Sequence, residues 1–251
     1  MDNKNDIKCK PHVIAFLDIL GSSEIIKENS LNMLNEINEL YSFAIKVCRK
    51  DGAIRDFSKL RIKIFSDNIL VAREIEEPHK GIRNHTCFGE IYDIVRFVGV
   101  FQGLALGKKF LLRGGITIGE LYFDDIFVWG NGLLRAYELE SSIAIFPRIA
   151  VDDAVICELK DTKFIGGNIL DTCKIAQDFD LVWYIDYLKR WNIEEVNGII
   201  LNSYNDIVEK IYSTPVNRVI QKLTWHINYV IKYLSEDIKK EILVLNKNEE
   251  T

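Results

Sequence analysis

The 251-residue sequence lacks the features of secreted and membrane-spanning proteins. Its five cysteines are scattered singly and no pair has C-x-x-C spacing, so we expect reduced thiols, with no disulfide framework and no zinc site. The charge-free stretch 97–107 is shorter than the roughly 18–20 residues of a spanning helix. The start, MDNKNDIKCK, has no apolar core of a signal peptide. We therefore expect a cytoplasmic protein with no membrane partner.

The sequence also lacks an excess of positive charge and has few prolines. Lys and Arg number 32 against 37 Asp and Glu, and the resulting net charge of −5 predicts no nucleic-acid partner. Only 4 residues are proline and 48% are hydrophobic, as is typical of a folded globular chain. We find no internal repeat and no low-complexity linker. We predict a polar segment over residues 1–11, a main domain over 12–200 and a helical extension over 201–251 packed on that domain.

Hydrophobic periodicity predicts alternating strands and helices. A buried strand over 12–20 precedes a helix over 22–48, a hairpin over 60–72 and a second helix over 88–106 that ends at Gly107. Further strands are expected over 110–123, 148–155 and 181–185, and helices over 202–246 with a break at Pro215. The order β-α-β-β-α-β predicts an α+β fold with a ferredoxin-like core, extra strands and a helical C-terminal extension.

Glycines interrupt the strand predicted over 110–123. Gly114 and Gly115 are adjacent, and Gly119 follows four residues later. A glycine within a strand is typical of a bulge, or of a place where a ligand approaches the backbone closely. We expect one of these two arrangements in this strand.

Two aspartates stand at the ends of neighbouring predicted strands. Asp18 is the one carboxylate in the apolar run HVIAFLDIL, and Asp67 lies in the turn of the hairpin over 60–72. A carboxylate at the end of an apolar strand is costly to bury unless it is paired or binds a metal ion. With the backbone carbonyl of Ile19, the pair predicts an oxygen-only site for Mg²⁺ or Mn²⁺. Alternatively, Asp67 is only a turn residue and Asp18 only a strand-end cap.

Four segments, in the correct order and covering about residues 12–155, resemble the class III nucleotidyl cyclases. They are FLDILGSS from Phe16, KIFSDNILVA from Lys63, LRGGITIGELYF from Leu112 and WGNGLLRAYELE from Trp129. The resemblance implies a class III cyclase catalytic domain over 12–200. It also implies attack of a ribose 3′-OH on the α-phosphate of the same nucleoside triphosphate, with Asp18 and Asp67 holding two Mn²⁺ or Mg²⁺ ions.

The chain departs from the purine cyclases of this family at three positions. Leu134 and Glu138 stand where an Asn and an Arg support the transition state, and Phe127 stands at the base-selecting position. The AYELE helix and the tail motif WHINY, from Trp225 to Tyr229, are similar instead to the bacterial pyrimidine cyclases of the Pycsar antiphage system. That resemblance implies a homodimer that converts CTP or UTP to a cyclic monophosphate, which activates a separate effector.

Several other residues are candidates for binding the nucleotide. Lys63 matches the base-contacting lysine of the family, with Arg61 as a lesser candidate on the same strand face. Arg113 lies within an apolar strand and needs an anionic partner, either a triphosphate or a structural carboxylate. Phe16 and Tyr137 complete the predicted nucleotide contacts. Tyr137 and Glu138 are expected either to bond the ribose or to stabilise the dimer, and Tyr137 is alternatively a core packing residue.

Two alternative functions remain open from the sequence. The loss of the Asn and Arg favours a catalytically degenerate dimer that senses a nucleotide, whereas retention of both aspartates argues against it. A purine cyclase would require a polar replacement for Phe127 that we do not find. The missing arginine would be replaced by Arg113, by Arg135 or by the metal ions.

Overall fold

The computed structural model describes residues 7–50, 52, 54, 56–76 and 86–240 of the chain. The first half of the chain forms β1 (Lys10–Ile19), α1 (Ser22–Lys50), the short 3₁₀ helix η1 (Phe57–Lys59), β2 (Leu60–Phe65), β3 (Asn68–Glu74), α2 (Phe88–Gly107) and β4 (Leu112–Phe123). The second half forms β5 (Val128–Trp129), α3 (Asn131–Glu138), the π-helical turn η2 (Leu139–Ile143), β6 (Ile149–Val151), α4 (Asp153–Asp161), α5 (Ile169–Cys173), β7 (Ile175–Gln177), β8 (Trp183–Ile185), the 3₁₀ helix η3 (Tyr187–Arg190), α6 (Ile193–Ser213) and α7 (Asn217–Ile231).

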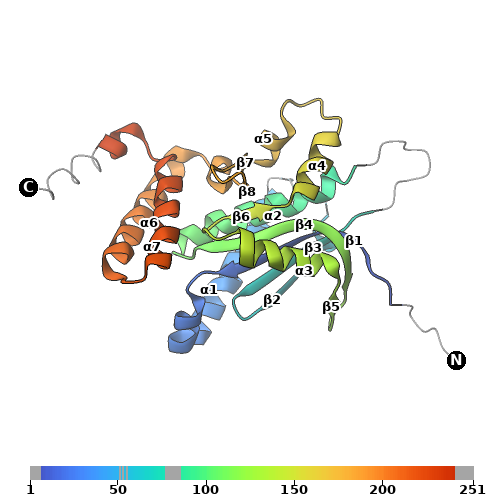
Figure 1. Ribbon diagram of the computed structural model, residues 1–251, viewed down its shortest axis with the longest axis horizontal. Coiled ribbons are helices and arrows are strands. Elements are labelled where there is room, and N and C mark those ends of the chain that lie inside the picture. The colour runs from blue at the N-terminus through green and yellow to red at the C-terminus, as the bar shows by residue number, and fades with distance from the viewer. Residues whose placement is uncertain (1–6, 51, 53, 55, 77–85, 241–251) are drawn as a thin grey trace, which may run out of the picture.

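The strands form one sheet in the order β2-β3-β1-β4-β6-β8-β7, and β5 pairs with β4 (Figure 1). β1 lies in the middle of the core, antiparallel to both β3 and β4, while β4 and β6 are parallel. The elements β1, α1, β2, β3, α2 and β4 give the βαββαβ order, and their strand order is that of a ferredoxin-like sheet. The predicted α+β fold class is confirmed.

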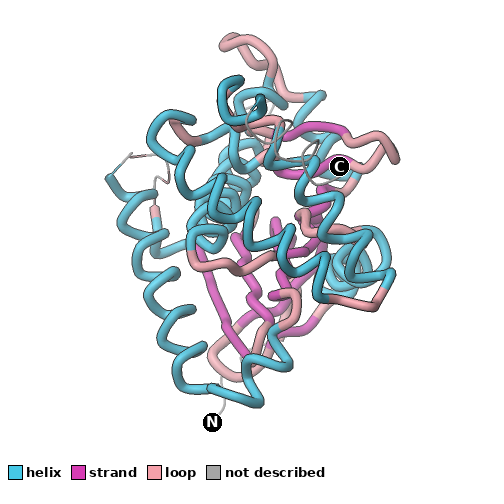
Figure 2. Tube along the Cα trace, turned by 90° about the vertical axis from the view of Figure 1, so that its left-hand side faces the viewer, coloured by secondary structure: helices cyan, strands magenta, loops and turns pink. Residues whose placement is uncertain are grey.

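The two faces of the sheet have different environments because side chains alternate along each strand. Val13, Ala15 and Leu17 of β1 are fully buried in the main core, beneath the long helices α1 and α2. Ile14 and Phe16 point the other way and pack in a smaller cluster with Ala136 of α3. We call this second side the α3 face. Figure 2 shows the strands at the centre of the molecule, with helices around them.

Most predicted element boundaries are confirmed within a few residues. α2 spans Phe88–Gly107, where a helix over 88–106 was expected, and the expected strand over 110–123 is the single strand β4. α6 and α7 are separated at Thr214-Pro215-Val216, because proline cannot donate an amide hydrogen and disfavours helix in the preceding residue. None of the helices formed by the described residues has both the length and the apolar composition needed to cross a bilayer.

The second half of the sheet differs from the expectation in two places. The strand expected over 148–155 stops after Val151, because α4 begins at Asp153. The strand β7 was not expected, and it is only three residues long. The predicted boundary at residue 200 falls inside α6, and the division into domains stays a prediction. Residues 1–6 of the predicted polar segment and 241–251 of the predicted extension lie outside the described residues.

Candidate functional site

The structure brings Asp18 and Asp67 to the same end of adjacent strands. Asp18 lies next to the end of β1 and pairs across the sheet with Asn68, the first residue of β3. Asp67 directly precedes Asn68, and its backbone carbonyl accepts a hydrogen bond from the Ile19 amide at 3.2 Å. The side chain of Ile19 is buried in the main core. These contacts create the juxtaposition of strand ends that the topology predicted.

Asp67 is held in place by polar neighbours. The Ser22 hydroxyl, at the start of α1, donates to Asp67 Oδ2, and Asn68 Nδ2 donates to Oδ1 at 3.0 Å. Partial burial acts to raise the pKa of Asp67, but hydrogen bonds from Ser22, from its own backbone amide and from Ser66 outweigh it and lower that pKa. Asp67 is therefore ionised at neutral pH.

Asp18 shares an arginine with a second carboxylate. Arg113, directly opposite Asp18 on β4, donates from Nε to Asp18 Oδ2 at 2.9 Å. The same Nε lies 2.7 Å from Oε1 of Glu140, a residue of η2 whose side chain is only 3% exposed. Burial raises the pKa of Glu140, and Arg113 opposes this shift without reversing it. Arg113 thus has the structural carboxylate partners that its position demands.

The oxygen atoms of Asp18 and Asp67, at this end of β1 and β3, match the ligand preference of Mg²⁺ and Mn²⁺. Within the described part of the chain, no three His, Cys, Asp or Glu side chains gather into a metal-binding cluster. A metal ion here would therefore use the two carboxylates of Asp18 and Asp67 together with backbone, solvent or substrate oxygens. The ionised state of Asp67 fits this role, whereas Arg113 competes for one oxygen of Asp18.

Aromatic side chains line the α3 face next to Asp18. The ring of Phe16 contacts Tyr137 of α3 edge-on at a centroid distance of 5.7 Å, and Phe65 of β2 at 6.2 Å. Phe16 is buried, while Tyr137 and Phe65 are each about half exposed, at 53% and 49%. Tyr137 is therefore not a core packing residue, and its ring is available at the surface beside the two aspartates.

Lys63 and Arg61 reach from β2 toward the hairpin between β4 and β5. Lys63 Nζ donates to the carbonyl of Asp125 at 2.9 Å and lies 5.5 Å from the centre of the Phe123 ring. Arg61 Nη1 donates to the carbonyl of Phe123 at 3.1 Å. Lys63 pairs with Leu70 on the α3 face, whereas Ile62 pairs with Val71 of the main core, as strict alternation predicted.

Phe127 lies in the tight turn that joins β4 to β5. The carboxylate of Asp124 accepts the backbone amides of Ile126 and Phe127, at 2.7 and 2.6 Å, and fixes the turn. The Phe127 side chain is exposed, as is that of the neighbouring Ile126. An apolar residue is therefore presented to the surface at the position where the resemblance expects a polar base-selecting group.

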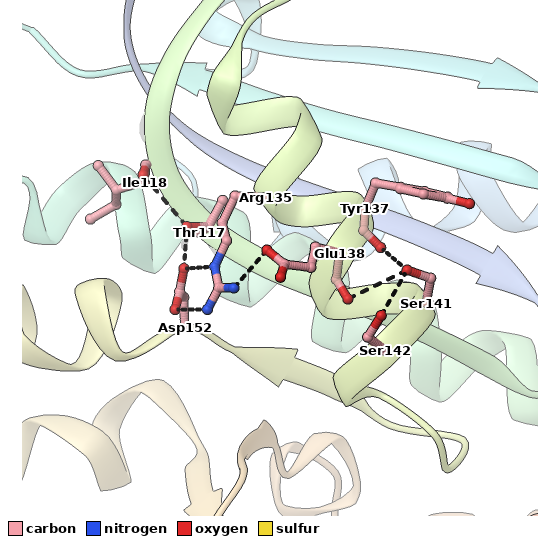
Figure 3. A network of polar contacts seen from close by, with 8 residues as sticks. All are labelled: Thr117, Ile118, Arg135, Tyr137, Glu138, Ser141, Ser142 and Asp152. Atoms are coloured by element: carbon pink, nitrogen blue, oxygen red, sulfur yellow. Dashed lines mark hydrogen bonds and ion pairs between the residues drawn. The ribbon is translucent and has the colours of Figure 1, made fainter.

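Arg135 of α3 is fully engaged within the protein (Figure 3). Its guanidinium donates two bonds of 2.9 Å to Asp152 and a third, of 2.8 Å, to Glu138. The Thr117 hydroxyl donates to the same Asp152 carboxylate at 2.6 Å. A bidentate arginine–carboxylate pair is among the stronger polar contacts in proteins. Arg135 therefore already has two carboxylate partners in this structure, and its replacement of the missing arginine stays a prediction. Leu134 is exposed, and Glu138 is the exposed partner of Arg135.

The tail motif from Trp225 to Tyr229 packs inside the protein. Trp225 Nε1 donates to Asp178 at 2.7 Å, and the Tyr229 hydroxyl donates to Asp186 at 2.9 Å. Burial lowers the pKa of His226 to about 3, and neither ring nitrogen has a hydrogen-bond partner among the described residues. His226 is therefore a neutral packing residue, and the motif attaches α7 to the sheet.

Gly115 and Gly119 of β4 accommodate a helix, which corrects the expectation of a bulge or a close ligand. A Cβ atom on Gly115 would overlap Leu139 and lie 2.7 Å from the carbonyl oxygen of Ala136, and one on Gly119 would lie 2.6 Å from the Cα of Gly132. β4 is continuous through all three glycines, so the strand contains no break at this point. The absent side chains instead let α3 and η2 approach the sheet closely.

A cavity of about 580 Å³ lies away from these residues. It is lined by apolar and polar residues of α1, α2 and α6 together with Leu188 and Trp191, and so belongs to the helical side of the sheet. The five cysteines form no disulfide; Cys48, Cys87 and Cys173 are buried, and Cys9 and Cys157 are exposed.

Sequence reasoning missed the residues that hold the two aspartates. Ser22 donates to Asp67, and Glu140 shares Arg113 with Asp18, and neither contact was expected. The glutamate that closes the motif AYELE is the available signal for Glu140, because a buried carboxylate demands a cation. For Ser22 the sequence contains no comparable signal, because Ser22 and Asp67 are 45 residues apart in the chain.

No protein-family model matches the chain, and comparison with curated protein sequences finds no match. Several solved structures resemble it. One is the monomeric guanylyl cyclase domain of the RhoGC fusion protein from the aquatic fungus Blastocladiella emersonii: 14% identical, with 70% of this chain and 96% of that chain covered and a TM-score of 0.47. A second is the catalytic core of a rhodopsin-guanylyl cyclase with converted specificity in complex with ATPαS, at 12% identity, 64% and 92% coverage and a TM-score of 0.40. A third, a bacterial light-regulated adenylyl cyclase, has 13% identity, 70% and 51% coverage and a TM-score of 0.39.

Proposed function

We propose that the chain is a metal-dependent nucleotidyl cyclase that converts CTP or UTP to the 3′,5′-cyclic monophosphate and pyrophosphate. The observation that carries this proposal is the pair Asp18 and Asp67, which meet at one end of β1 and β3 within a βαββαβ sheet. The four sequence segments that resemble class III cyclases include both aspartates. Their oxygen atoms suit Mg²⁺ or Mn²⁺.

In the proposed reaction, the ribose 3′-oxygen forms a bond to the α-phosphorus of the same nucleotide. The bond between the α-phosphorus and the oxygen that bridges to the β-phosphate breaks, pyrophosphate leaves with the electron pair, and the hydroxyl proton passes to solvent. Asp18 and Asp67 would hold two divalent ions, which lower the pKa of the hydroxyl and neutralise phosphate charge. The chain positions the nucleotide so that attacking and leaving oxygens are in line.

The base and ribose would bind on the α3 face beside the aspartates. Phe16 and Tyr137 offer ring surface there, and Lys63 offers an ammonium group that could donate to a pyrimidine carbonyl in place of the Asp125 carbonyl. The exposed, apolar Phe127 favours a pyrimidine over a purine, whose recognition in the related cyclases requires a polar group at this position. Arg113 would remain with Glu140 when Asp18 binds metal.

A homodimer is part of this proposal. Cyclases of the resembled family work as head-to-tail dimers whose sites lie between subunits. Large apolar side chains are exposed on α3 and on the hairpin between β4 and β5: Ile126, Phe127, Trp129, Leu134 and Tyr137. Exposed apolar groups gathered on neighbouring elements are typical of an interaction surface. By the same resemblance, the cyclic product would activate a separate effector in antiphage defence.

Incubation of the full-length chain with ATP, GTP, CTP and UTP, each with Mn²⁺, tests the proposed reaction. Mass spectrometry should detect a cyclic pyrimidine monophosphate and pyrophosphate. Asp18→Asn and Asp67→Asn should each reduce turnover at least roughly 100-fold, since both carboxylates would carry metal, while circular dichroism stays that of the wild type. A cyclic purine would contradict the role of Phe127. Full activity of Asp67→Asn would contradict the two-carboxylate site.

A nucleotide sensor is the second candidate, and one observation favours it. Arg113 already neutralises Asp18 in the structure, as expected where a carboxylate is structural. A sensor would bind nucleoside triphosphate without any cyclic product. Binding that persists in Asp18→Asn, with no turnover by the wild type under any metal, would favour this function over the cyclase.

A further inference from the structure

The C-terminal helix α7 is docked at the end of the sheet where the two aspartates lie. β1 runs toward α1 and β4 starts at the same end, beside α6 and α7 (Figure 1). The bonds from Trp225 to Asp178 and from Tyr229 to Asp186 fix α7 against the loops that flank β8. The buried Arg148, at the start of β6, adds a bond of 2.6 Å to the same Asp178. The side chains on the inner stripe of α7 therefore have defined positions.

Lys222 lies on this inner stripe. Residues 222, 225, 226, 229 and 233 follow helical spacing, and Trp225, His226 and Tyr229 on that stripe are buried. Lys222 itself is half-buried, at a point where the pattern predicts an apolar residue. Its ammonium group forms no hydrogen bond or ion pair with the described residues. A half-buried lysine without a direct partner is available to bind an anion.

The charges around Lys222 belong to the candidate site. The amide of Gly114, next to Arg113, donates to the Arg148 carbonyl at 3.1 Å, and Arg148 and Trp225 share the Asp178 carboxylate. Lys222, one helical turn before Trp225, therefore lies on the side of α7 that faces this part of the sheet, where Arg113, Asp18 and Glu140 act on it electrostatically. Burial, and next Arg113, lower the pKa of Lys222, while Asp18 and Glu140 counteract them. Arg218 precedes Lys222 by one helical turn, a like-charge spacing that destabilises a helix. Lys222 thus lies among charges that include the two carboxylates sharing Arg113.

We infer that Lys222, assisted by Arg218, binds the β- and γ-phosphates of the nucleoside triphosphate, so that α7 forms part of the catalytic site. This role rests on the proposed cyclase function. The triphosphate would give Lys222 the anion that no side chain supplies. Lys222 would also supply the triphosphate with positive charge from α7. On α3, Glu138 is an anion, and the guanidinium of Arg135 is bonded to Asp152.

Calorimetric titration of the full-length protein with inorganic tripolyphosphate tests this subsite directly. Lys222→Gln should weaken binding roughly ten-fold or more, because a charge-assisted contact is lost, and Lys222→Arg should retain most of the affinity. Lys232→Gln, at the exposed end of the same helix, is the matched control and should bind as the wild type does. Lys222→Met, which keeps the apolar stem, replaces Lys222→Gln if that variant does not fold.

The outcomes separate this subsite from the cyclase function. If Lys222→Gln binds tripolyphosphate as tightly as the wild type, or if Lys232→Gln weakens binding equally, the subsite is wrong. If the wild type makes a cyclic nucleotide and Lys222→Gln has the same KM for the nucleoside triphosphate, the cyclase activity is supported and the phosphate subsite is wrong. If tripolyphosphate binding depends on Lys222 but no nucleoside triphosphate is cyclised, the phosphate subsite is supported and the proposed cyclase activity is wrong.

Discussion

At the scale of single residues, Asp18 at the end of β1 shares its partner Arg113 with another carboxylate. Asp18 is bound by Arg113, which is held at the same time by the buried Glu140. An arginine with two carboxylates can leave one of them without becoming an unpaired charge, a state that is costly when buried. Glu140 therefore makes Asp18 available to another cation.

We expect Glu140→Gln to weaken Mn²⁺ binding roughly 3- to 10-fold, because Arg113 would then remain with Asp18 and compete with the ion. Loss of the electron paramagnetic resonance signal of unbound Mn²⁺ measures the affinity without relying on turnover. Glu138→Gln is the matched control, since Glu138 is exposed and contacts Arg135 rather than Arg113. Equal Mn²⁺ affinity of wild type and Glu140→Gln would show that Glu140 does not release Asp18.

The second residue-scale prediction concerns pH. The pKa of Asp67 is lowered, so its stabilising contribution is present above the ordinary value of 3.8 and is lost as pH falls through the lower folded value. Ser22→Ala removes one of the hydrogen bonds that lower this pKa. We expect it to cost about 1 kcal/mol of unfolding free energy at neutral pH, with the difference from wild type shrinking under acid conditions.

Urea denaturation at a series of pH values checks this, together with an NMR titration of the Asp67 carboxyl carbon. Asp67→Asn combined with Ser22→Ala completes a double-mutant cycle, in which the coupling between the two sites should be strongest at neutral pH. An Asp67 pKa that stays the same in Ser22→Ala would contradict the assigned cause.

At the scale of elements, β4 and the α3–η2 segment pack against each other at close range. Gly115 lies directly below Ala136 and Leu139, and any side chain there must displace the helix. α3 carries Tyr137, and η2 carries Glu140, so this contact also sets the height of two candidate site residues above the sheet.

We expect Gly115→Ala to cost about 1–3 kcal/mol through overpacking, and to reduce any turnover because α3 must shift. Gly198→Ala is a control of the same chemistry: Gly198 lies in α6 with nothing within 4 Å of the added methyl group. Alanine there should stabilise the protein by about 0.5–1 kcal/mol, as in helix interiors generally. Chemical denaturation of both variants measures the two effects, and a destabilised Gly198→Ala would undermine the comparison.

The sequence predicted the long helices and strands and the place of the two aspartates. It did not predict the short strands or the contacts that depend on how distant elements pack. The pattern of α2 and the alternation of β1 extend over enough residues to define a period, whereas β6 and β7 have three residues each and define none. Asp18 was identifiable because a carboxylate interrupts an apolar strand. Lys222 was not, because its significance depends on where α7 docks, through contacts such as that of Trp225 with Asp178, 47 positions earlier.

At the scale of the whole molecule, the exposed apolar side chains of the α3 face favour association of two copies of the chain. The main core lies under α1 and α2, while the α3 face carries exposed side chains such as Trp129 and Leu134, at 76% and 70% exposure. A sheet face with a small core and a large apolar periphery is suited to burial against a second copy. The proposed site would then lie at the junction of two chains.

We expect the wild type to sediment as a dimer and Leu134→Asp or Trp129→Glu as a monomer, because a charge placed in an apolar interface is desolvated without a partner. Turnover should fall in the variants that no longer dimerise, because the two subunits would share sites. Ile165→Glu, fully exposed in the loop between α4 and α5, is the control and should leave the dimer intact. A wild type that remains monomeric at micromolar concentration would rule out this interface.

The aromatic residues of α7 have an optical consequence. Trp225 lies between Phe146 and Tyr229, with ring planes within 4° and 5° of parallel and centroids 5.7 and 5.6 Å away. Rings held rigidly in an asymmetric surrounding give strong circular dichroism in the near ultraviolet, a signal lost once tertiary packing loosens even where helices persist. That spectrum therefore reports the docking of α7 separately from its helicity, and can reveal whether phosphate binding tightens the C-terminal part of the molecule.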